Sequence, residues 1–599
     1  MDVILRTPWG GPWRKFTDPV RVITATHAAD VPRALAEADA ELQKGSYVAG
    51  FVTYEASAGF ELPVREPHPG LPLVFFGVFD EGSVEHLRRL PEADPPSFGS
   101  WTPSIDHAAY LDAIAAIKNR IEAGDTYQIN YTFRLEAPFA GEPLGAMHGL
   151  VAAQDGPWGA YVSTGQHVIC SASPELFFSV DGERVTCRPM KGTSARGYWP
   201  DDDHARAEAL RASPKNRAEN VMIVDMVRND LGRIARTGSV RVISLHDIER
   251  YPLQWQMTST VEGLVPQPSL EKLFGAMFPC GSITGAPRIS SMGIIRDLES
   301  TPRGVYTGAI GFASPHGQAH FNVAIRTVVF NLAAGRAEFG VGSGVVWDSV
   351  DRDEYDECLL KAEMLSGSPR PAFVGGASYI TAERPGFKLL ETILWTPDDG
   401  FALLDRHLSR LGASAASFGF TCDLDDVHRQ LGLAVGDLRG PSRTRILLDH
   451  DGSVLCEAVD LVPLNDPLRV ALAAEPIDRS DVFLYHKTTK RDVYDRARAS
   501  RPEADSVLLW NDAGEVTEGT EANLVIVRDG VKVTPPIDCG LLPGTLRAEL
   551  LASGQIVEGR VMKDELASAD EIWLINSVRG WMRVVLVAGV DGAGGDGGA

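Results

Sequence analysis

The stretch from Glu175 to Gly197 reads ELFFSVDGERVTCRPMKGTSARG and organises the first half of this chain. Two runs of alternating apolar residues meet at Asp181-Gly182, which is a strong short-range signal of a β-hairpin. Folding about this turn returns the second strand beside the first, so Glu175 and Lys191 are expected near each other. A carboxyl group and an amine so placed can act as proton donor and as nucleophile or base. The alternative is an ordinary surface ion pair.

The segment around Lys191, residues 188–197, contains one proline and two glycines. This composition disfavours the interior of a strand or helix and is typical of a turn. We therefore expect a turn that holds Lys191 against a ligand.

The composition describes an ordinary globular protein that is too long for one hydrophobic core. The chain has 599 residues, 44% of them hydrophobic and 23% charged, so two large domains or several smaller ones are expected. Its formal net charge of −23 argues against nucleic acid and anionic membrane as partners. The seven cysteines form no C-x-x-C pair, so neither a disulfide framework nor a zinc site is indicated. The sequence has no signal-like segment and no apolar run of membrane length, so a cytoplasmic location is expected.

Strand-like and helical runs alternate through the first part of the chain. The expected strands cover 20–24, 47–54, 73–79, 127–135 and 160–171, and an expected helix covers 32–44. Asp106 is a good N-cap for a second helix, whose apolar residues recur at helical spacing until Gly124. The first part is therefore predicted to be α+β, with mixed or antiparallel sheet.

Two later segments, 213–234 and 351–365, read as helices that carry acidic residues. The expected apolar positions of the first are Val221, Val224, Met226 and Val227. Glu219 on this helix and Glu354 and Glu357 on the other would suit magnesium, which takes oxygen ligands. The alternative is a pair of solvated acidic faces.

Three glycine-rich stretches lie between these helices, at 278–288, 306–312 and 339–345. Dense glycine lets backbone N–H groups approach an anionic ligand closely. None of the three has the Walker or dinucleotide spacing, so a nucleotide is not implied. Arg326 adds a cation suited to gripping a carboxylate through two hydrogen bonds. Read alone, each stretch could equally be a turn or a bulge.

Eight segments of this half resemble the chorismate-utilising enzymes: anthranilate synthase component I, aminodeoxychorismate synthase component I, isochorismate synthase and salicylate synthase. The segments are SPELF (173–177), KGTSARG (191–197), AENVMIVDMVRNDLGR (218–233), GSITGAPR (281–288), YTGAIG (306–311), AIRT (324–327), GVGSG (340–344) and DECLLKA (356–362). The resemblance implies a sandwich of two antiparallel sheets with flanking helices over residues 1–367. It implies magnesium at Glu219 and Glu357, with Glu354 beside them. The substrate-binding residues that it implies are Thr193, Tyr306, Arg326, Gly342, Ser343, Gly344 and Lys361.

Within that family Lys191 discriminates between products, because anthranilate synthases typically have alanine there and aminodeoxychorismate synthases have lysine. The resemblance implies that the Lys191 amine adds to C2 of chorismate while the C4 hydroxyl leaves with a proton from Glu175. Ammonia would then attack C4 and give 4-amino-4-deoxychorismate. Three positions depart from the family pattern: Met190 replaces Ile, Arg288 replaces Lys, and Gln256 stands where many relatives have His.

Residues 368–376 have the composition of a linker, and the pattern changes after them. The expected strands beyond it cover 389–395, 401–404, 443–449, 470–473, 506–510 and 522–528, with a helix over 407–418. Four segments resemble the fold-type IV pyridoxal-phosphate enzymes, whose fold has two subdomains: LDRHLSRL (404–411), HKTTKR (486–491), GEVTEGTEANL (514–524) and LLPGTLR (541–547). The resemblance covers residues 377–590, and residues 591–599 are expected to be a disordered tail.

That resemblance implies pyridoxal 5′-phosphate held as an imine by Lys487, because only a primary amine forms an exchangeable imine. Glu518 would accept the pyridine N–H. Arg410 and the backbone at Gly544 and Thr545 would bind the phosphate.

Other residues of the second half are expected to face the substrate or to compete for the cofactor. Lys490 is a rival for the imine. Arg491, four residues after Lys487, resembles the K-x-x-x-R pattern of aminodeoxychorismate lyases. Asn576, Ser577 and Arg579 are expected to face the substrate.

The two halves suit one another as successive enzymes. An aminodeoxychorismate synthase followed by a lyase that eliminates pyruvate would convert chorismate to 4-aminobenzoate. The sequence has no C-x-G-x-x nucleophile elbow followed by H-x-E, so a separate glutamine amidotransferase subunit or free ammonia is expected to supply nitrogen. A homodimer through the second domain is a further expectation. Two alternatives stay open: an anthranilate synthase joined to an aminotransferase, and a synthase with a catalytically silent assembly module.

Overall fold

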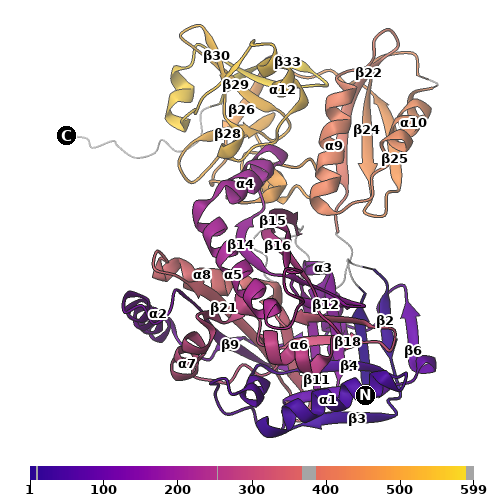
Figure 1. The fold of residues 1–599 in the computed structure, drawn as a ribbon. Coiled ribbons are helices and arrows are strands. Elements are labelled where there is room, and N and C mark those ends of the chain that lie inside the picture. The colour runs from indigo at the N-terminus through magenta and orange to yellow at the C-terminus, as the bar shows by residue number, and fades with distance from the viewer. Residues whose placement is uncertain (8–10, 155, 252–253, 367–385, 437, 588–599) are drawn as a thin grey trace. The chain divides into compact units, whose positions relative to one another are not determined.

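The structure, a computed structural model, describes residues 1–7, 11–154, 156–251, 254–366, 386–436 and 438–587. These residues form two compact units, one built mainly from residues up to 366 and the other mainly from residue 386 onward (Figure 1). The predicted linker, 368–376, and the predicted tail, 591–599, lie outside the described residues. None of the helices in the described ranges is long and apolar enough to cross a membrane.

The first unit contains two sheets in which neighbouring strands run antiparallel. Across the 11-stranded sheet the order is β17 (Gly285–Ala286), β9 (Gln128–Ala140), β21 (Arg336–Val345), β20 (Thr327–Asn331), β11 (His167–Ser173), β10 (Trp158–Ser163), β1 (Asp2–Arg6), β2 (Trp13–Phe16) and β6 (Val84–Leu87), with β7 (Ser97–Phe98) and β8 (Thr102–Pro103) beside β9. Across the 10-stranded sheet it is β14 (Met190–Ala195), β16 (Gln254–Leu264), β13 (Arg184–Arg188), β12 (Leu176–Asp181), β19 (Gln318–Val323), β18 (Ala309–Ala313), β4 (Tyr47–Val52), β5 (Val74–Phe79) and β3 (Arg21–Ala25), with β15 (Arg241–Arg250) beside β16.

Side chains from both sheets meet in a shared core. The ring of Phe16 on β2 lies 5.4 Å from that of Phe79 on β5 and 5.8 Å from that of Phe312 on β18, measured between centroids. Two sheets packed face to face bury the inward side chains of each in this way. The predicted antiparallel sandwich with flanking helices is therefore confirmed.

This part of the chain contains helices, most of which pack against the sandwich. They are α1 (Val31–Gln43), α2 (His107–Glu122), α3 (Pro143–Gln154), α4 (Pro200–Ala212), α5 (Pro214–Gly232), α6 (Leu270–Met277), α7 (Arg288–Leu298) and α8 (Asp351–Ser366), with short 3-10 turns η2 (Ala28–Asp30), η3 (Tyr54–Phe60), η4 (Glu81–Ser83) and η5 (Gly281–Ile283). The Asp106 side chain accepts a hydrogen bond from the Ala109 N–H at 2.8 Å and caps α2 as predicted. Gly124 follows the helix with φ of +80°, a conformation that favours glycine.

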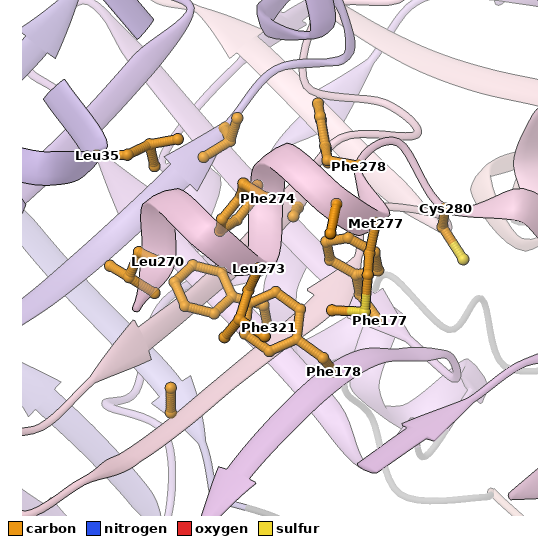
Figure 2. Packing of buried hydrophobic residues seen from close by; sticks show 14 of the residues in the cluster. Leu35, Phe177, Phe178, Leu270, Leu273, Phe274, Met277, Phe278, Cys280 and Phe321 are labelled. Atoms are coloured by element: carbon orange, nitrogen blue, oxygen red, sulfur yellow. The ribbon is translucent and has the colours of Figure 1, made fainter. Parts of the chain in front are cut away.

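Helix α6 is anchored by a group of phenylalanines from the hairpin and from β19. Figure 2 shows Phe177, Phe178 and Phe321 gathered against Phe274 of α6, at centroid distances of 5.8, 5.6 and 5.3 Å. Consecutive residues of a regular strand face opposite sides, but the register of β12 shifts between Leu176 and Phe178. This bulge allows both phenylalanines to reach α6 and fixes the backbone next to Glu175.

The predicted hairpin is confirmed, with a small shift in its turn. Strands β12 and β13 pair from Leu176 opposite Arg188 to Asp181 opposite Arg184, so the loop residues are Gly182 and Glu183. Gly182 has φ of +60°. Glycine adopts this left-handed backbone without steric cost, as such short loops require.

The turn predicted around Lys191 is wrong, because most of that segment forms the edge strand β14. Met190 pairs with Thr258 and Thr193 pairs with Gln256, with a register shift between the two pairs and φ of +99° at Gly192. An edge strand tolerates a bulge and a preceding proline, since neither breaks a central ladder. Lys191 therefore sits in a bulge, where a side chain is turned away from the regular pleat.

The apolar stripe of α5 differs by one residue from the prediction. Val224 and Val227 are buried as expected, together with Ile223 and Leu231, but Val221 is 38% exposed. The buried residues follow the 3.6-residue period, and position 221 falls just outside that stripe. Met226, also expected to be apolar and inward, is only half-buried.

The second unit has two sheets of its own. The 4-stranded sheet has the order β23 (Gly400–Phe401), β22 (Leu389–Thr396), β24 (Ser442–Leu448) and β25 (Val454–Asp460). The 8-stranded mixed sheet has the order β28 (Val516–Gly519), β27 (Ser506–Trp510), β26 (Leu468–Leu472), β33 (Gly580–Leu586), β32 (Glu571–Asn576), β29 (Asn523–Arg528), β30 (Val531–Thr534) and β31 (Val557–Glu558). The helices are α9 (Leu404–Phe418), α10 (Leu424–Val435), α11 (Asp492–Ala499) and α12 (Thr545–Ala552), with 3-10 turns η6 (Val482–Leu484), η7 (Ile537–Cys539) and η8 (Lys563–Ser568).

Most strands expected in this half form where predicted, but the strand expected over 401–404 does not. Only Phe401 of that range is in a strand, and α9 already begins at Leu404. The apolar side chains of α9, such as Leu411 and Phe418, pack into one core with β22 and β24. A short apolar run at a helix start carries no periodicity that separates it from a strand.

Candidate active sites

A pocket of about 380 Å³ in the first unit gathers residues from β14, β21, α5 and α8. Of the residues predicted from the sequence, it is lined by Glu175, Lys191, Thr193, Glu219, Tyr306, Arg326, Gly342, Gly344, Glu354, Glu357 and Lys361. A larger hollow of about 1090 Å³, lined by α5 and the end of α6, contains none of the predicted site residues. The smaller pocket is therefore the candidate site.

Glu175 presents a buried carboxyl group to this pocket. Its Oε1 accepts a hydrogen bond from the Ser282 hydroxyl at 2.6 Å. Burial raises the pKa of Glu175 to about 7, against the opposing effects of the Ser282 hydrogen bond and the Lys191 charge. A carboxyl group with such a pKa can hold and release a proton near neutral pH. Ser282 was not singled out from the sequence, although it lies in the glycine-rich stretch 278–288.

Lys191 faces the same pocket because the facing strand has glycine opposite its amine. A Cβ placed on Gly344 would lie 2.6 Å from the Lys191 Nζ and 2.6 Å from the Gln128 Nε2. The Lys191 carbonyl is held on the other side by the Asn220 side-chain amide of α5, at 3.4 Å. Because Gly344 has no side chain, it leaves space for the Lys191 amine and the Gln128 amide.

Gln128 on β9, whose amide lies close to Gly344 of the pocket lining, is a residue that the sequence analysis missed. Its side chain is 1% exposed, and neither of its amide atoms has a hydrogen-bond partner in the described structure. Buried amides nearly always have partners in proteins, so an unpaired one beside Lys191 has donors and acceptors to offer a ligand. Only the pairing of β9 with β21, which places Asn130 opposite Gly344, brings it there.

The glycines of β21 allow close packing rather than forming an anion-binding loop. A Cβ on Gly340 would lie 2.2 Å from the Tyr306 ring, and a Cβ on Gly342 would lie 2.6 Å from the Tyr131 carbonyl oxygen. The Gly342 carbonyl accepts a hydrogen bond from the Lys361 amine at 2.8 Å. Ser343 is placed differently: its hydroxyl hydrogen-bonds the Tyr110 hydroxyl at 2.9 Å. The alternation of a strand turns Ser343 away from the pocket that Gly342 and Gly344 line.

Two cations of the site, Arg326 and Lys361, are held by neighbouring groups. Arg326, with φ of +53°, donates to the Lys361 carbonyl at 3.0 Å, and burial lowers its pKa to about 10. The Lys361 amine pairs with the Glu357 carboxylate at 2.5 Å. These contacts tie the segment just before β20 to α8 and concentrate positive charge beside Tyr306, a suitable setting for a carboxylate.

Three carboxylates from α5 and α8 line the same pocket. Burial raises the pKa of Glu219, and the nearby carboxylates of Glu354 and Glu357 add to this, against Lys191 and Lys215. Glu354 accepts a hydrogen bond from the Ser349 hydroxyl at 2.7 Å. Among the described residues, no three acidic, His or Cys side chains converge closely enough to form a metal cluster by themselves. Glu219 and Glu357 nevertheless fit magnesium, which binds through one or two carboxylates and completes its shell with water and substrate.

The two candidate lysines of the second unit, Lys487 and Lys490, lie in different environments. Burial and, as a smaller cause, the Arg410 charge lower the pKa of Lys487 to about 8. Backbone hydrogen bonds from Leu390 N–H to the Lys487 carbonyl and from Thr489 N–H to the Lys388 carbonyl, both 2.9 Å, join this segment to β22. The Lys490 amine instead lies over the Phe483 ring, 4.7 Å from its centroid. A buried amine with a lowered pKa is the better nucleophile of the two.

Three hydrogen-bond donors surround the buried carboxyl group of Glu518. Its Oε1 accepts from the Tyr494 hydroxyl at 2.8 Å and from the Leu542 N–H at 3.0 Å, and its Oε2 accepts from the Asn523 amide at 3.1 Å. Burial nevertheless raises the pKa of Glu518 to about 7. None of these three donors is charged, and the protonated ring of pyridoxal phosphate would supply a cationic one.

Arg410 lies beside the N-terminus of α12. It donates from Nη1 to the Pro543 carbonyl at 3.0 Å and from Nε and Nη2 to Glu391 at 2.8 and 2.7 Å. Gly544, the N-cap, has no side chain to cap the helix, and a Cβ there would lie 1.9 Å from the Asn523 Oδ1. A helix N-terminus with free N–H groups next to an arginine fits a phosphate.

The other residues that were predicted to face the substrate already have contacts within the second unit. The Arg491 guanidinium donates to the Thr520 carbonyl at 2.5 Å and lies 4.5 Å from the Tyr494 ring centroid. The backbone N–H of Arg579 donates to the Asn576 side chain at 2.8 Å. The Ser577 hydroxyl lies 3.0 Å from His407 Nε2, a contact that the sequence did not suggest.

Comparison with known proteins gives each half a family. Residues 4–367 match the family model described as chorismate binding enzyme, and residues 388–587 match the model for class IV aminotransferases. An aminodeoxychorismate synthase of Streptomyces griseus is 37% identical over 388 residues, which are 64% of this chain and 48% of the relative. Anthranilate synthase component 1 of Streptomyces coelicolor is 38% identical over 376 residues, 54% of this chain and 73% of the relative. The chain thus spans about half the length of the first relative.

A solved structure gives the same assignment for the first unit. Anthranilate synthase component I from Streptococcus pneumoniae superposes with a TM-score of 0.51 at 25% sequence identity, covering 61% of this chain and 92% of that one. The family match includes every residue that lines the first pocket. The chain therefore belongs to the chorismate binding enzyme family and carries a class IV aminotransferase domain after it in the sequence.

Proposed function

We propose that the chain makes 4-aminobenzoate from chorismate in two steps, amination at C4 in the first unit and loss of pyruvate in the second. Relatives of both names, aminodeoxychorismate synthase and anthranilate synthase, are similar to this chain to almost the same degree. The identity of the product is therefore argued from the residues that line the pocket. The observation that carries the proposal is the amine of Lys191 and the carboxyl group of Glu175 facing one cavity.

In the first step, the Lys191 Nζ bonds to C2 of chorismate as the C4–O bond breaks. The Glu175 carboxyl gives its proton to the departing hydroxyl, which leaves as water, and its pKa of about 7 makes that proton available. Ammonia then bonds to C4 and the C2–N bond to Lys191 breaks, which frees the amine. The new amino group gives up one proton, which restores the Glu175 carboxyl. Arg326 and Tyr306 bind the substrate, and Glu219 and Glu357 would hold magnesium against its carboxylates.

In the second step, residues of the class IV domain hold the cofactor and move protons. When bound, pyridoxal phosphate supplies an electron sink. Lys487 would attach it and, once released, carry a proton to and from the substrate. Glu518 would hold the ring nitrogen, and Arg491 and Arg579 would orient the substrate's carboxylates. We further propose that a separate glutamine amidotransferase supplies the ammonia and that the protein works in the cytoplasm.

Product analysis of the full chain with chorismate, magnesium, ammonium and pyridoxal phosphate tests this proposal. We expect wild type to release 4-aminobenzoate and pyruvate. Lys487→Ala should accumulate 4-amino-4-deoxychorismate, and Lys191→Ala should lower amination by about 10²–10⁴-fold. Lys490→Ala is the matched control and should behave as wild type. Anthranilate as product would refute the assignment of the first unit, and unchanged 4-aminobenzoate release by Lys487→Ala would refute that of the second.

A further inference from the structure

Glu391 is a buried carboxylate of the second unit with no role in the proposed reaction. It is 0% exposed, and its Oε2 accepts from both the Arg410 Nη2 and the His407 Nδ1 at 2.7 Å. Burial alone would raise the pKa of Glu391, but the Arg410 charge and the His407 hydrogen bond outweigh it and lower this pKa to about 2. Glu391 is therefore an anion under ordinary conditions. An ionised carboxylate only accepts, so the His407 Nδ1 carries a proton.

The other nitrogen of His407 faces two hydroxyl groups at the N-terminus of α12. Its Nε2 lies 3.0 Å from the Ser577 Oγ and 3.1 Å from the Thr545 Oγ1. Glu391 and His407 thus connect β22 and α9 to the end of β32 and the start of α12. Arg410 belongs to the same group, because one carboxylate oxygen binds both it and His407.

Some hydrogen-bond donors around Glu391 and His407 remain available to a ligand after these contacts. Arg410 has five N–H donors, and its contacts to Glu391 and Pro543 use three of them. The His407 Nε2 forms a hydrogen bond with one of the two hydroxyls at a time, so the other hydroxyl can turn its proton toward an anion. A phosphate bound here would thus receive bonds from Arg410, from Ser577 or Thr545, and from the first N–H groups of α12.

We propose that Glu391 and His407 are positioning residues that hold Arg410, Ser577 and Thr545 around the phosphate of the cofactor. The inference rests on the proposed function only for the identity of the cofactor. It assigns a task to two buried residues that need not touch substrate or cofactor. Removing His407 should leave the pocket's donors present but unaligned.

The effect should depend on the phosphate, which separates positioning from general stability. Pyridoxal lacks the phosphate but can still react with Lys487, so binding of both compounds to the cofactor-free full chain can be followed by absorbance at about 410–420 nm. His407→Asn keeps an amide that can reach Glu391 and removes the atom at Nε2. We expect it to weaken pyridoxal phosphate binding by about 10- to 100-fold, and pyridoxal binding by less than about threefold.

Two further variants complete the test. Ser417→Ala removes a hydroxyl of the same helix that bonds only the Ala413 carbonyl, at 2.9 Å, and should leave both affinities unchanged. Ser577→Ala removes a half-buried hydroxyl and should selectively weaken pyridoxal phosphate, which keeps the inference testable if His407→Asn does not fold.

The outcomes separate this inference from the proposed function. Equal weakening of both compounds by His407→Asn, or wild-type affinity for pyridoxal phosphate in either His407→Asn or Ser577→Ala, overturns the inference alone. Wild type that binds the two compounds equally well overturns the inference and the cofactor assignment together. Wild type that prefers pyridoxal phosphate but releases no 4-aminobenzoate overturns only the proposed reaction.

Discussion

Glu175 in the first unit and Glu391 in the second are both buried glutamates, yet their pKa values move in opposite directions. Glu175 has one hydroxyl donor, from Ser282, and burial raises its pKa to about 7. Glu391 has Arg410 and His407 on its two oxygens, and they lower its pKa to about 2 despite the same burial. Burial therefore disfavours a charge only until enough cationic donors surround it. The first environment suits a proton donor and the second a permanent anion that orients its neighbours.

The contrast between Glu175 and Glu391 depends above all on Glu175 being a proton donor. Glu175→Gln keeps the size of the side chain and an oxygen for Ser282, but removes the exchangeable proton. Amination should fall by about 10²–10⁴-fold, measured as chorismate consumption with ammonium. Glu183→Gln is the control, because Glu183 pairs with Arg236 on the exposed loop of the same hairpin and should not affect the rate. A near-normal rate for Glu175→Gln would remove Glu175 from the mechanism.

The same substitution at the other glutamate should cost stability instead. Glu391→Gln leaves Arg410 and His407 with an uncharged partner in a buried site, which typically costs about 3–5 kcal/mol in the free energy of unfolding. Glu549→Gln on α12 removes the half-exposed partner of Arg406 on α9 and should cost less than about 1 kcal/mol. Denaturant titration followed through the transition of the second unit measures both. Similar small losses would mean that Glu391 is not held as an ion.

Gly344→Ala tests the first pocket through space rather than charge. The new methyl group would lie 2.6 Å from the Lys191 amine and from the Gln128 amide, so both must move. A displaced nucleophile should slow amination by about 10- to 100-fold, with the second step unaffected. Gly293→Ala in α7 has no atom within 4 Å of its added Cβ and should react like wild type. An unchanged rate for Gly344→Ala would show that Lys191 does not act from this position.

The smallest expected effects are pH dependences. Raising the pH should slow amination in the first unit, whereas lowering the pH should destabilise the second. The pKa of Glu175 lies above its ordinary value of 4.5, so its protonated, active form is lost as pH rises through about 7. At constant free ammonia, amination should fall by about tenfold per pH unit above that value, and Glu175→Gln should lack this limb. A limb of the same position in the variant would assign it to another group.

Glu391 has a pKa below its ordinary value of 4.5, so its stabilising effect is present above about pH 4.5 and is lost as pH falls toward 2. Unfolding of the second unit in urea should therefore weaken over this acid range in wild type. Glu391→Gln should lack that part of the pH dependence. Parallel curves for the two proteins would contradict the lowered pKa.

Local features of the sequence were predicted well because their causes are local. Asp106 capped its helix, the two-residue loop at Gly182 closed its hairpin, and β27 has the predicted bounds. Wrong predictions arose where tertiary position overrode composition. The Lys191 segment has the residues of a turn, but at a sheet edge its glycine became a bulge within a strand. Ser343 sits inside a motif of pocket glycines, yet strand alternation turns its hydroxyl to Tyr110.

The sequence by itself determined the two families, the chemical types of the site residues and most of the secondary structure, because motifs and periodicity are properties of neighbouring residues. Only the tertiary structure decided which residues share an environment. Gln128 reaches Lys191 through the pairing of β9 with β21. Glu391 on β22 contacts His407 on α9, and His407 in turn contacts Ser577 after β32. The pKa of a buried carboxyl group depends on those partners and on exclusion of water, and both arise when distant segments pack together.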